Sequence, residues 1–314
     1  MFNKLLFIFL LWSIIITEVS ANDIYINQVG DGIDVDIVQD GSNNRVSRKE
    51  DTVTSTPNKA TFIGKNQTLD VTQTGNNNFL GLYKHYYSSD NQTSGTITAT
   101  QTGDNNLMRI DVHGDNNSVS GIQLTSNAEM DLEIDMDGNN IDAKQACSEG
   151  SYCIKDEMIL NVYMADDNNI KLGQGYKISE SGSFQYDGTE KGGHEMDLYV
   201  SGDRNDIMLS QRSQNNTSGH YMDVNIYSDD NDVHVIQESN STKTLNLTIN
   251  NDDNNVFVHQ KKSHSQTATI SLSGAYGTDL SLQMGSNQST QAGSYSITQD
   301  CQTVGGCAVS VVQN

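Results

Sequence analysis

The sequence has 314 residues, of which 35% are hydrophobic, and its 40 acidic against 18 basic residues give a formal net charge of -22. This charge excludes electrostatic attraction to nucleic-acid phosphates or anionic lipid as a main activity, and it favours a neutral or cationic partner. The alternative, that the acids only keep the protein in solution, stays open.

The N-terminal residues have the pattern of a secretory signal peptide. Lys4 precedes the apolar run 5–16, and Val19, Ser20 and Ala21 provide a small-residue cleavage site. The apolar run is about a dozen residues, shorter than the roughly 20 that a membrane-spanning helix needs. We therefore expect residues 1–21 to be removed and the mature chain to be extracellular or at the cell surface, without stable membrane insertion. A retained N-terminal anchor is the alternative.

The chain after residue 21 is polar enough to suggest disorder. However, its apolar residues alternate with polar ones over short windows, as Leu245, Leu247 and Ile249 do. Alternation of period two is typical of half-buried β-strands, and disorder does not require it.

A turn rich in Asp and Asn, followed six residues later by glutamine, recurs along the chain. The pairs are Asn117 and Gln123, Asn139 and Gln145, Asn168 and Gln174, Asn205 and Gln211, Asn231 and Gln237, and Asn254 and Gln260. Successive glutamines are 22 to 37 residues apart, which predicts a coil of about 22 residues with insertions of variable length. Weaker units ending at Gln283 and Gln313 are expected to form degenerate terminal coils.

Half of this period is also visible, because Asn106 and Asn117 are 11 residues apart. Each coil should therefore run strand, turn, strand, turn, with Asn, Asp and Gly supplying the turns. We predict an all-β fold: a β-solenoid of about 22-residue coils stacked at about 4.8 Å, with variable loop insertions. Buried amides would pair with the identical residue one coil away. The expected structural ladder comprises Gln73, Gln101, Gln123, Gln145, Gln174, Gln211, Gln237, Gln260, Asn78, Asn106, Asn117, Asn139, Asn168, Asn205, Asn231 and Asn254.

The solenoid is expected to form one domain, residues 22–314, and its insertions should emerge at one corner of the stack. They are expected at about 45–66, 84–95, 146–157, 175–195 and 212–220. The insertion at 84–95 falls on the opposite half-turn, so the decorated edge should switch near residue 110.

Three segments resemble the curlin repeat of curli-type bacterial surface fibres, whose unit runs Gln-x-Gly-x-x-Asn. They are Gln39–Asn44, Gln73–Asn78 and Gln101–Asn106. The resemblance implies a β-solenoid subunit that assembles end to end into extracellular amyloid-like fibres for adhesion and biofilm matrix. It also implies self-association or other curlin-like subunits as partners. From Asp137 onward the first glutamine is usually lost, and this departure bears on polymerisation more than on the fold.

The cysteines form two pairs, Cys147 with Cys153 and Cys301 with Cys307. In an exported protein this spacing predicts two local disulfides, and neither pair has the spacing of a zinc site. The Cys301–Cys307 disulfide is expected to replace an Asp/Asn turn and to lock the last coil.

Acidic turns raise the possibility of calcium binding. Their candidate ligands are Asp166, Asp167, Asp203, Asp229, Asp230, Asp252 and Asp253. Calcium would relieve repulsion between carboxylates stacked in register. Alternatively, these residues only form turns. The Gly-Gly-x-Gly-x-Asp calcium repeat is absent, and no metal or other cofactor is expected.

No catalytic pattern is evident among the histidines, so we expect no enzyme, although pectate-lyase-like solenoids show that this architecture can host one. The expected function is that of an exported structural or adhesive protein. The alternative is a monomeric receptor- or glycan-binding solenoid, which would recognise a surface glycan or protein through aromatic loops. The loop candidates are Tyr83, His85, Tyr86, Tyr87, Tyr176, Phe184, Tyr186 and His194.

Overall fold

The structure is a computed structural model. It describes residues 22–24, 27–29, 32, 34–47, 61–63, 67–82, 95–112, 117–124, 126–135, 138–146, 153–163, 168–175, 192–202, 204–213, 219–250, 253–261, 265–274, 277–285, 293–301 and 307–313. The expected signal peptide, 1–21, lies outside these residues. Within them, no helix is long and apolar enough to cross a membrane.

Two parallel sheets form most of the molecule. The eight-stranded sheet contains β6 (Met108–Val112), β7 (Glu129–Asp135), β9 (Cys153–Tyr163), β11 (Gly192–Ser201), β13 (His220–Tyr227), β15 (Lys243–Asn250), β17 (Gln266–Gly274) and β19 (Ser294–Cys301). The seven-stranded sheet contains β8 (Asn140–Gln145), β10 (Asn169–Gln174), β12 (Asp206–Ser213), β14 (Asp232–Ser239), β16 (Asn255–Lys261), β18 (Asp279–Gly285) and β20 (Val309–Gln313).

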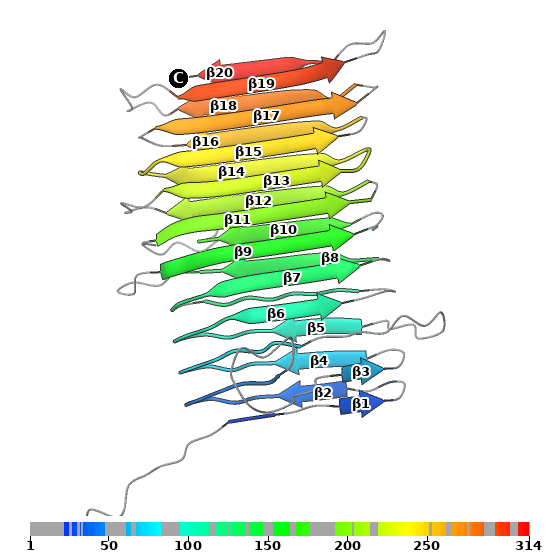
Figure 1. Ribbon diagram of the computed structural model, residues 1–314, viewed down its shortest axis with the longest axis vertical. Coiled ribbons are helices and arrows are strands. Elements are labelled where there is room, and N and C mark those ends of the chain that lie inside the picture. The colour runs from blue at the N-terminus through cyan, green and yellow to red at the C-terminus, as the bar shows by residue number, and fades with distance from the viewer. Residues whose placement is uncertain are drawn as a thin grey trace, which may run out of the picture.

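From β7 onward the chain alternates between these sheets, so each coil contributes one strand to each. Figure 1 shows the coils stacked along the long axis, with β1 and β2 near one end and β19 and β20 at the other. The expected all-β solenoid is therefore confirmed.

The N-terminal coils add two smaller sheets. One contains β2 (Asp34–Ile37), β4 (Gln67–Val71) and β5 (Gly95–Ala99), and the other β1 (Asn27–Val29) and β3 (Thr61–Ile63). Residues 118–123 join the three-stranded sheet to the seven-stranded one. Ser118 bridges to Thr96 of β5, and the Val119 amide donates to the Asn140 carbonyl of β8 at 3.0 Å.

The core consists of apolar columns that run along the stack. Alternate strand residues point inward, and the parallel register places equivalent residues one above another. Met130, Met158, Met196, Met222 and Leu245 form one such column, and all are fully buried. Burying a side chain of this size stabilises the fold by about 1.5–3 kcal/mol, so a thin core suffices when it is repeated along the axis.

A column of buried glutamines lies beside this apolar core. Side-chain amides connect Gln39, Gln73, Gln101, Gln123 and Gln145, and then Gln174, Gln211, Gln237 and Gln260, at N···O distances of 2.5–2.9 Å. The register places Gln145 beside Gln174 and so joins the two runs into one column. Bonded partners are 22 to 37 residues apart in sequence. The insertions therefore change the length of the loops but leave the column in place.

The asparagines form two columns at opposite corners. Asn78 donates to Asn44 at 2.9 Å and Asn106 donates to Asn78 at 2.7 Å. A second column connects Asn168, Asn205, Asn231 and Asn254 at 2.6–3.0 Å. Asn139 shares the register of Asn168, and Asn117 is likewise buried. The 11-residue spacing of Asn106 and Asn117 corresponds to the step from one corner to the other.

The weak unit ending at Gln283 does not continue the glutamine column. The register pairs Gln260 with Met284, while Gln283 pairs with His259 on the outward face. The expected offset was therefore wrong by one residue, and a shift of one residue in a strand exchanges the two faces. Gln313 does share the register position of Met284, but it is exposed.

The strands extend into several expected insertions. β9 begins at Cys153, β11 at Gly192 and β5 at Gly95, while β12 continues to Ser213. Pairing explains the first two, because Cys153 and Gly192 are register partners in the eight-stranded sheet. The expected insertion at 84–95 directly precedes β5, whereas those at 146–157 and 175–195 directly follow β8 and β10. The first position is therefore at the start of a strand, whereas the other two are at the ends of strands, on the opposite edge of the continuous sheet.

Candidate functional site

The outward face of the eight-stranded sheet carries many carboxylates. They are Glu129, Asp131, Glu133 and Asp135 of β7, Glu157 of β9, Glu195 and Asp197 of β11, and Asp223 of β13. We call this set the acidic face. Glu129, Glu157 and Glu195 occupy one register column, and Asp197 pairs with Asp223 in the next. Like charges therefore stand about one strand spacing apart, about 4.8 Å.

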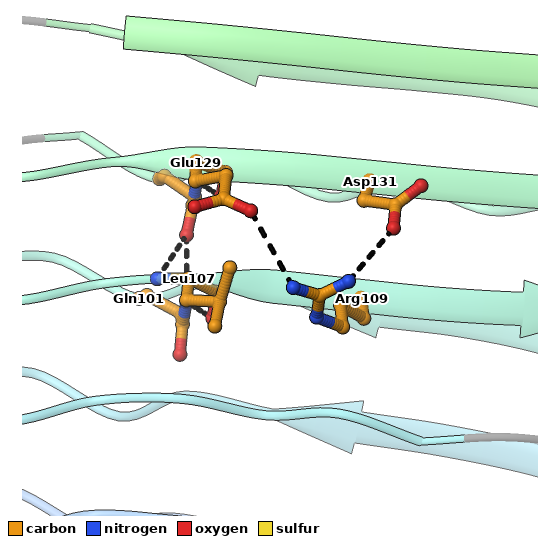
Figure 2. Close-up of polar contacts among 6 residues, drawn as sticks. Gln101, Leu107, Arg109, Glu129 and Asp131 are labelled. Atoms are coloured by element: carbon orange, nitrogen blue, oxygen red, sulfur yellow. Dashed lines mark hydrogen bonds and ion pairs between the residues drawn. The ribbon is translucent and has the colours of Figure 1, made fainter. Parts of the chain in front are cut away.

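One arginine neutralises part of the acidic face. Figure 2 shows Arg109 of β6 forked between two carboxylates of β7. Its Nη1 lies 3.0 Å from Asp131 Oδ2 and its Nη2 3.5 Å from Glu129 Oε1. The three side chains are 24–33% exposed. The guanidinium group therefore partly neutralises the negative charge of these two carboxylates.

Further along the face the carboxylates interact unfavourably. Burial raises the pKa of Asp197 from 3.8 to about 6, and the neighbouring Glu195, Asp223 and Glu157 add to the increase. Both causes oppose ionisation. A cation brought against this face would relieve the repulsion.

A row of tyrosines crosses the same sheet face. The ring centroids of Tyr163 and Tyr199 are 5.4 Å apart, as are those of Tyr199 and Tyr227, and Tyr227 is 41% exposed. We call these three residues the tyrosine row. Nearby, Asn246 Nδ2 donates to the Tyr221 hydroxyl at 3.0 Å. Exposed aromatic rings beside polar groups can stack on sugar rings or receive cations.

The outward face of the seven-stranded sheet differs, because three of its acids lie beside basic side chains. Lys144 lies 3.1 Å from Asp142 and Arg212 lies 3.9 Å from Glu238. His234 lies 3.3 Å from Asp232. The uncompensated negative charge of the described strands is therefore concentrated on the other sheet.

The last coil exposes side chains at positions whose equivalents are buried in the coils below it. Tyr295 shares the core column of Ala268 but is 47% exposed, and Val309 shares that of Leu280 but is 48% exposed. β19 and β20 are the terminal strands of their sheets. No described segment pairs with their outer edges, so this end presents apolar side chains and unpaired backbone groups.

Only some of the calcium candidates can be placed. Asp229, Asp230 and Asp253 are described, whereas Asp166, Asp167, Asp203 and Asp252 lie outside the described residues. Asp230 and Asp253 have φ angles of 53° and 52°, as does Arg204 with 55° at the equivalent turn position. Within the described part of the chain, no group of three or more His, Cys, Asp or Glu residues could hold a metal ion. The positive φ angles of Asp230 and Asp253 are typical of a turn position, and calcium binding by the full set stays a prediction.

The cysteines are only partly visible. Cys307 is disulfide-bonded, and Cys301 ends β19. Cys153 begins β9, while Cys147 lies outside the described residues. Both pairings remain predictions.

The aromatic loop residues expected to bind a ligand cannot be placed, with one exception. Residues 83–87 and 176–186 lie outside the described part of the chain, but His194 lies in β11 and is 1% exposed. His194 is therefore not a loop residue, because β11 begins before it. The sequence analysis did not identify the tyrosine row, because insertions of different length separate its three members along the chain.

The comparisons with known proteins add no relatives. No protein-family model, no curated protein and no solved structure matches this chain.

Proposed function

We propose that this protein is an exported structural or adhesive component whose solenoids stack end to end on or around the cell. The observation that carries the proposal is the last described coil, in which Tyr295 and Val309 continue core columns and no described coil lies above them. The curlin-like segments of the N-terminal coils support the same function.

The opposite end of the stack offers a complementary surface. Among the described strands, β2 is the terminal strand of its sheet and pairs only with β4. Beside it, Val38 is 69% exposed. A parallel strand added to β20 or β19 by the first coil of a second copy would continue the same register direction. Such a head-to-tail contact does not close on itself, and it generates a filament.

Sedimentation velocity of the purified chain over a range of concentrations tests this proposal. We expect association that increases with concentration and is abolished by Val309→Lys, because a charge on the uncovered core position opposes strand addition. Ser310→Lys adds the same charge one residue away, on the outward face, and should retain association. A wild-type chain that sediments as a monomer throughout would refute the proposal.

The tyrosine row supports a second candidate function, recognition of a surface carbohydrate. Three rings spaced at 5.4 Å present an aromatic surface flanked by hydrogen-bonding groups on a rigid sheet. Stacking of sugar rings on aromatic side chains is a common mode of recognition.

Binding of the chain to immobilised glycans tests the second candidate. Tyr199→Ala removes the central ring and should weaken binding at least about tenfold, the equivalent of about 1.4 kcal/mol. Phe257→Ala removes a ring from the outward face of the other sheet and should leave binding unchanged. Equal binding by both variants, or no binding by the wild type to any glycan, would reject this candidate.

A further inference from the structure

A buried column of basic residues lies beside the glutamine column. Each ladder glutamine also donates its Nε2 to a backbone carbonyl across the corner, and the residue before that carbonyl points into the column. In the N-terminal coils this residue is Asn44, Asn78 or Asn106, before the carbonyls of Arg45, Phe79 and Leu107. In later coils it is His194, His220, Lys243 or Gln266, before the carbonyls of Glu195, Tyr221, Thr244 and Thr267.

The type of residue at this column position therefore changes along the stack. Its asparagines bond to one another, because an amide both donates and accepts. Ala128 precedes the Glu129 carbonyl, to which the Gln123 amide donates, and Asp156 of β9 precedes the Glu157 carbonyl, to which the Gln145 amide donates. From β11 to β15 the position is basic: His194, His220 and Lys243 are 1%, 2% and 0% exposed.

The basic residues do not satisfy one another as the asparagines do. The rings of His194 and His220 stack with centroids 4.8 Å apart and an angle of 5° between their planes, so neither ring nitrogen can point at the other ring. His194 Nε2 lies 3.0 Å from the Arg212 carbonyl. Neither Nδ1 nor Nε2 of His220 has a hydrogen-bond partner, although both are buried.

Lys243 completes the column on the other side of His220. The two residues are register partners, and Lys243 Nζ donates to the carbonyls of Ser239 at 2.6 Å and Ser241 at 2.9 Å. The carbonyl groups of the turn between β14 and β15 thus accept hydrogen bonds from the Lys243 ammonium group. Gly175 packs closely against this corner, because a Cβ added there would lie 2.9 Å from His194 Nε2 and would collide with the Arg212 carbonyl.

We propose that this column is an acid-sensitive element: a proton taken up by His220 opens the corner between the coils of β11, β13 and β15. A protonated His220 would carry a buried, unpaired charge between a histidine ring and an ammonium group, and the coil must open to hydrate it. This property is separate from the proposed function and does not depend on it.

Among the described residues, the column positions on either side of His220 are both basic. His194 faces His220 from β11 and Lys243 faces it from β15. Arg212 and Glu238, at the ends of β12 and β14, pair with each other at 3.9 Å. Asp156 of β9 shares the register of His194, one coil further from His220.

The sign of the pH dependence follows from the state that binds the proton. Burial first, and then the charges of His194 and Lys243, hold the pKa of His220 well below 6.5. In the open state His220 takes up a proton as the pH falls through its usual pKa of 6.5, whereas in the closed state it stays neutral. The stability of the closed state is therefore lost as the pH falls below 6.5. One proton can raise the opening constant by up to about tenfold per pH unit, or about 50-fold from pH 6.5 to 4.5.

Hydrogen exchange of the full chain between pH 7.5 and 4.5, corrected for intrinsic exchange rates, tests the proposal. Amides of β13 and β15 should lose protection as the pH falls, whereas those of β7, next to Ala128, should not. His220→Asn restores the amide of the N-terminal coils and should remove the pH dependence. His234→Asn, on the outward face of β14, is the matched control and should retain it.

A second measurement needs no variant. The ring NMR signals of His220 in the unmodified chain should stay those of neutral imidazole until β13 loses protection. A His220 ring that titrates near pH 6.5 with β13 still protected would overturn the proposal. So would a pH dependence of β13 exchange that is the same in His220→Asn and in the wild type.

Discussion

The glutamine column makes a quantitative prediction for Gln237→Met. Gln237 is fully buried, accepts from Gln260 at 2.8 Å, and donates to Gln211 at 2.9 Å and to the Thr244 carbonyl at 3.0 Å. Methionine has a similar volume, and Met284 occupies the position of the column that follows Gln260. The substitution therefore removes the three hydrogen bonds while largely preserving the packing.

The magnitude follows from the groups left behind. Gln211 Oε1 and the Thr244 carbonyl lose a donor, and Gln260 Nε2 loses one of its two acceptors. An unpaired buried polar group costs about 1–3 kcal/mol, so we expect a loss of about 3–5 kcal/mol. This is a large part of the 5–15 kcal/mol typical of folded domains.

Urea unfolding followed by circular dichroism measures the change, provided that the slope of the transition is unchanged. Gln283→Met is the matched control, because Gln283 lies on the outward face one residue from the column. Its effect should stay within about 0.5 kcal/mol. If Gln237→Met costs less than about 1 kcal/mol, the glutamine hydrogen bonds do not stabilise the corner.

Three further predictions concern the sheet face and the last coil. Asp197→Asn should stabilise the protein at pH 7, by on the order of 1 kcal/mol after solvent screening. Because the folded-state pKa of Asp197 is raised to about 6, the gain should fade as the pH drops from 6 to 4, and a constant gain in urea titrations would contradict the assignment. Arg109→Met should cost about 1 kcal/mol by thermal unfolding, and less at high salt; an effect independent of salt would exclude the ion pairs as its cause. Replacing Cys301 and Cys307 together by serine should cost roughly 2 kcal/mol, speed hydrogen exchange in residues 295–314 and promote end-to-end association; free thiols found by mass spectrometry in the protein purified without reductant would rule this out.

The period of the solenoid could be predicted from the sequence because its corner chemistry repeats. Gln101, Gln123 and Gln145 are each 22 residues apart, and Asn and Asp mark the turns. The coils of longer spacing kept the same unit, so the insertions did not hide it.

The register of the last coils was harder to predict. Gln283 and Met284 are adjacent, and the six-residue spacing favoured the glutamine. The alternation of Leu280, Leu282 and Met284, all buried, determines the face instead. Packing along the whole strand outweighs one amide, because a shift would turn every apolar residue outward.

The candidate sites could not be predicted because they depend on neighbours from different coils. Tyr163, Tyr199 and Tyr227 are separated by insertions of different length, and so are His194 and His220. None of these residues is one of the recurring amides of the repeating unit. Their proximity follows only from the register, which the sequence pattern alone leaves undefined outside that unit.

Cryo-electron microscopy of the purified chain, at concentrations where it associates, tests the account most directly. We expect particles longer than one solenoid, in which β19 and β20 of one copy lie against the first coil of the next, with strands spaced at about 4.8 Å across the junction. Particles joined side by side through their sheet faces, or single solenoids at every concentration, would contradict the account.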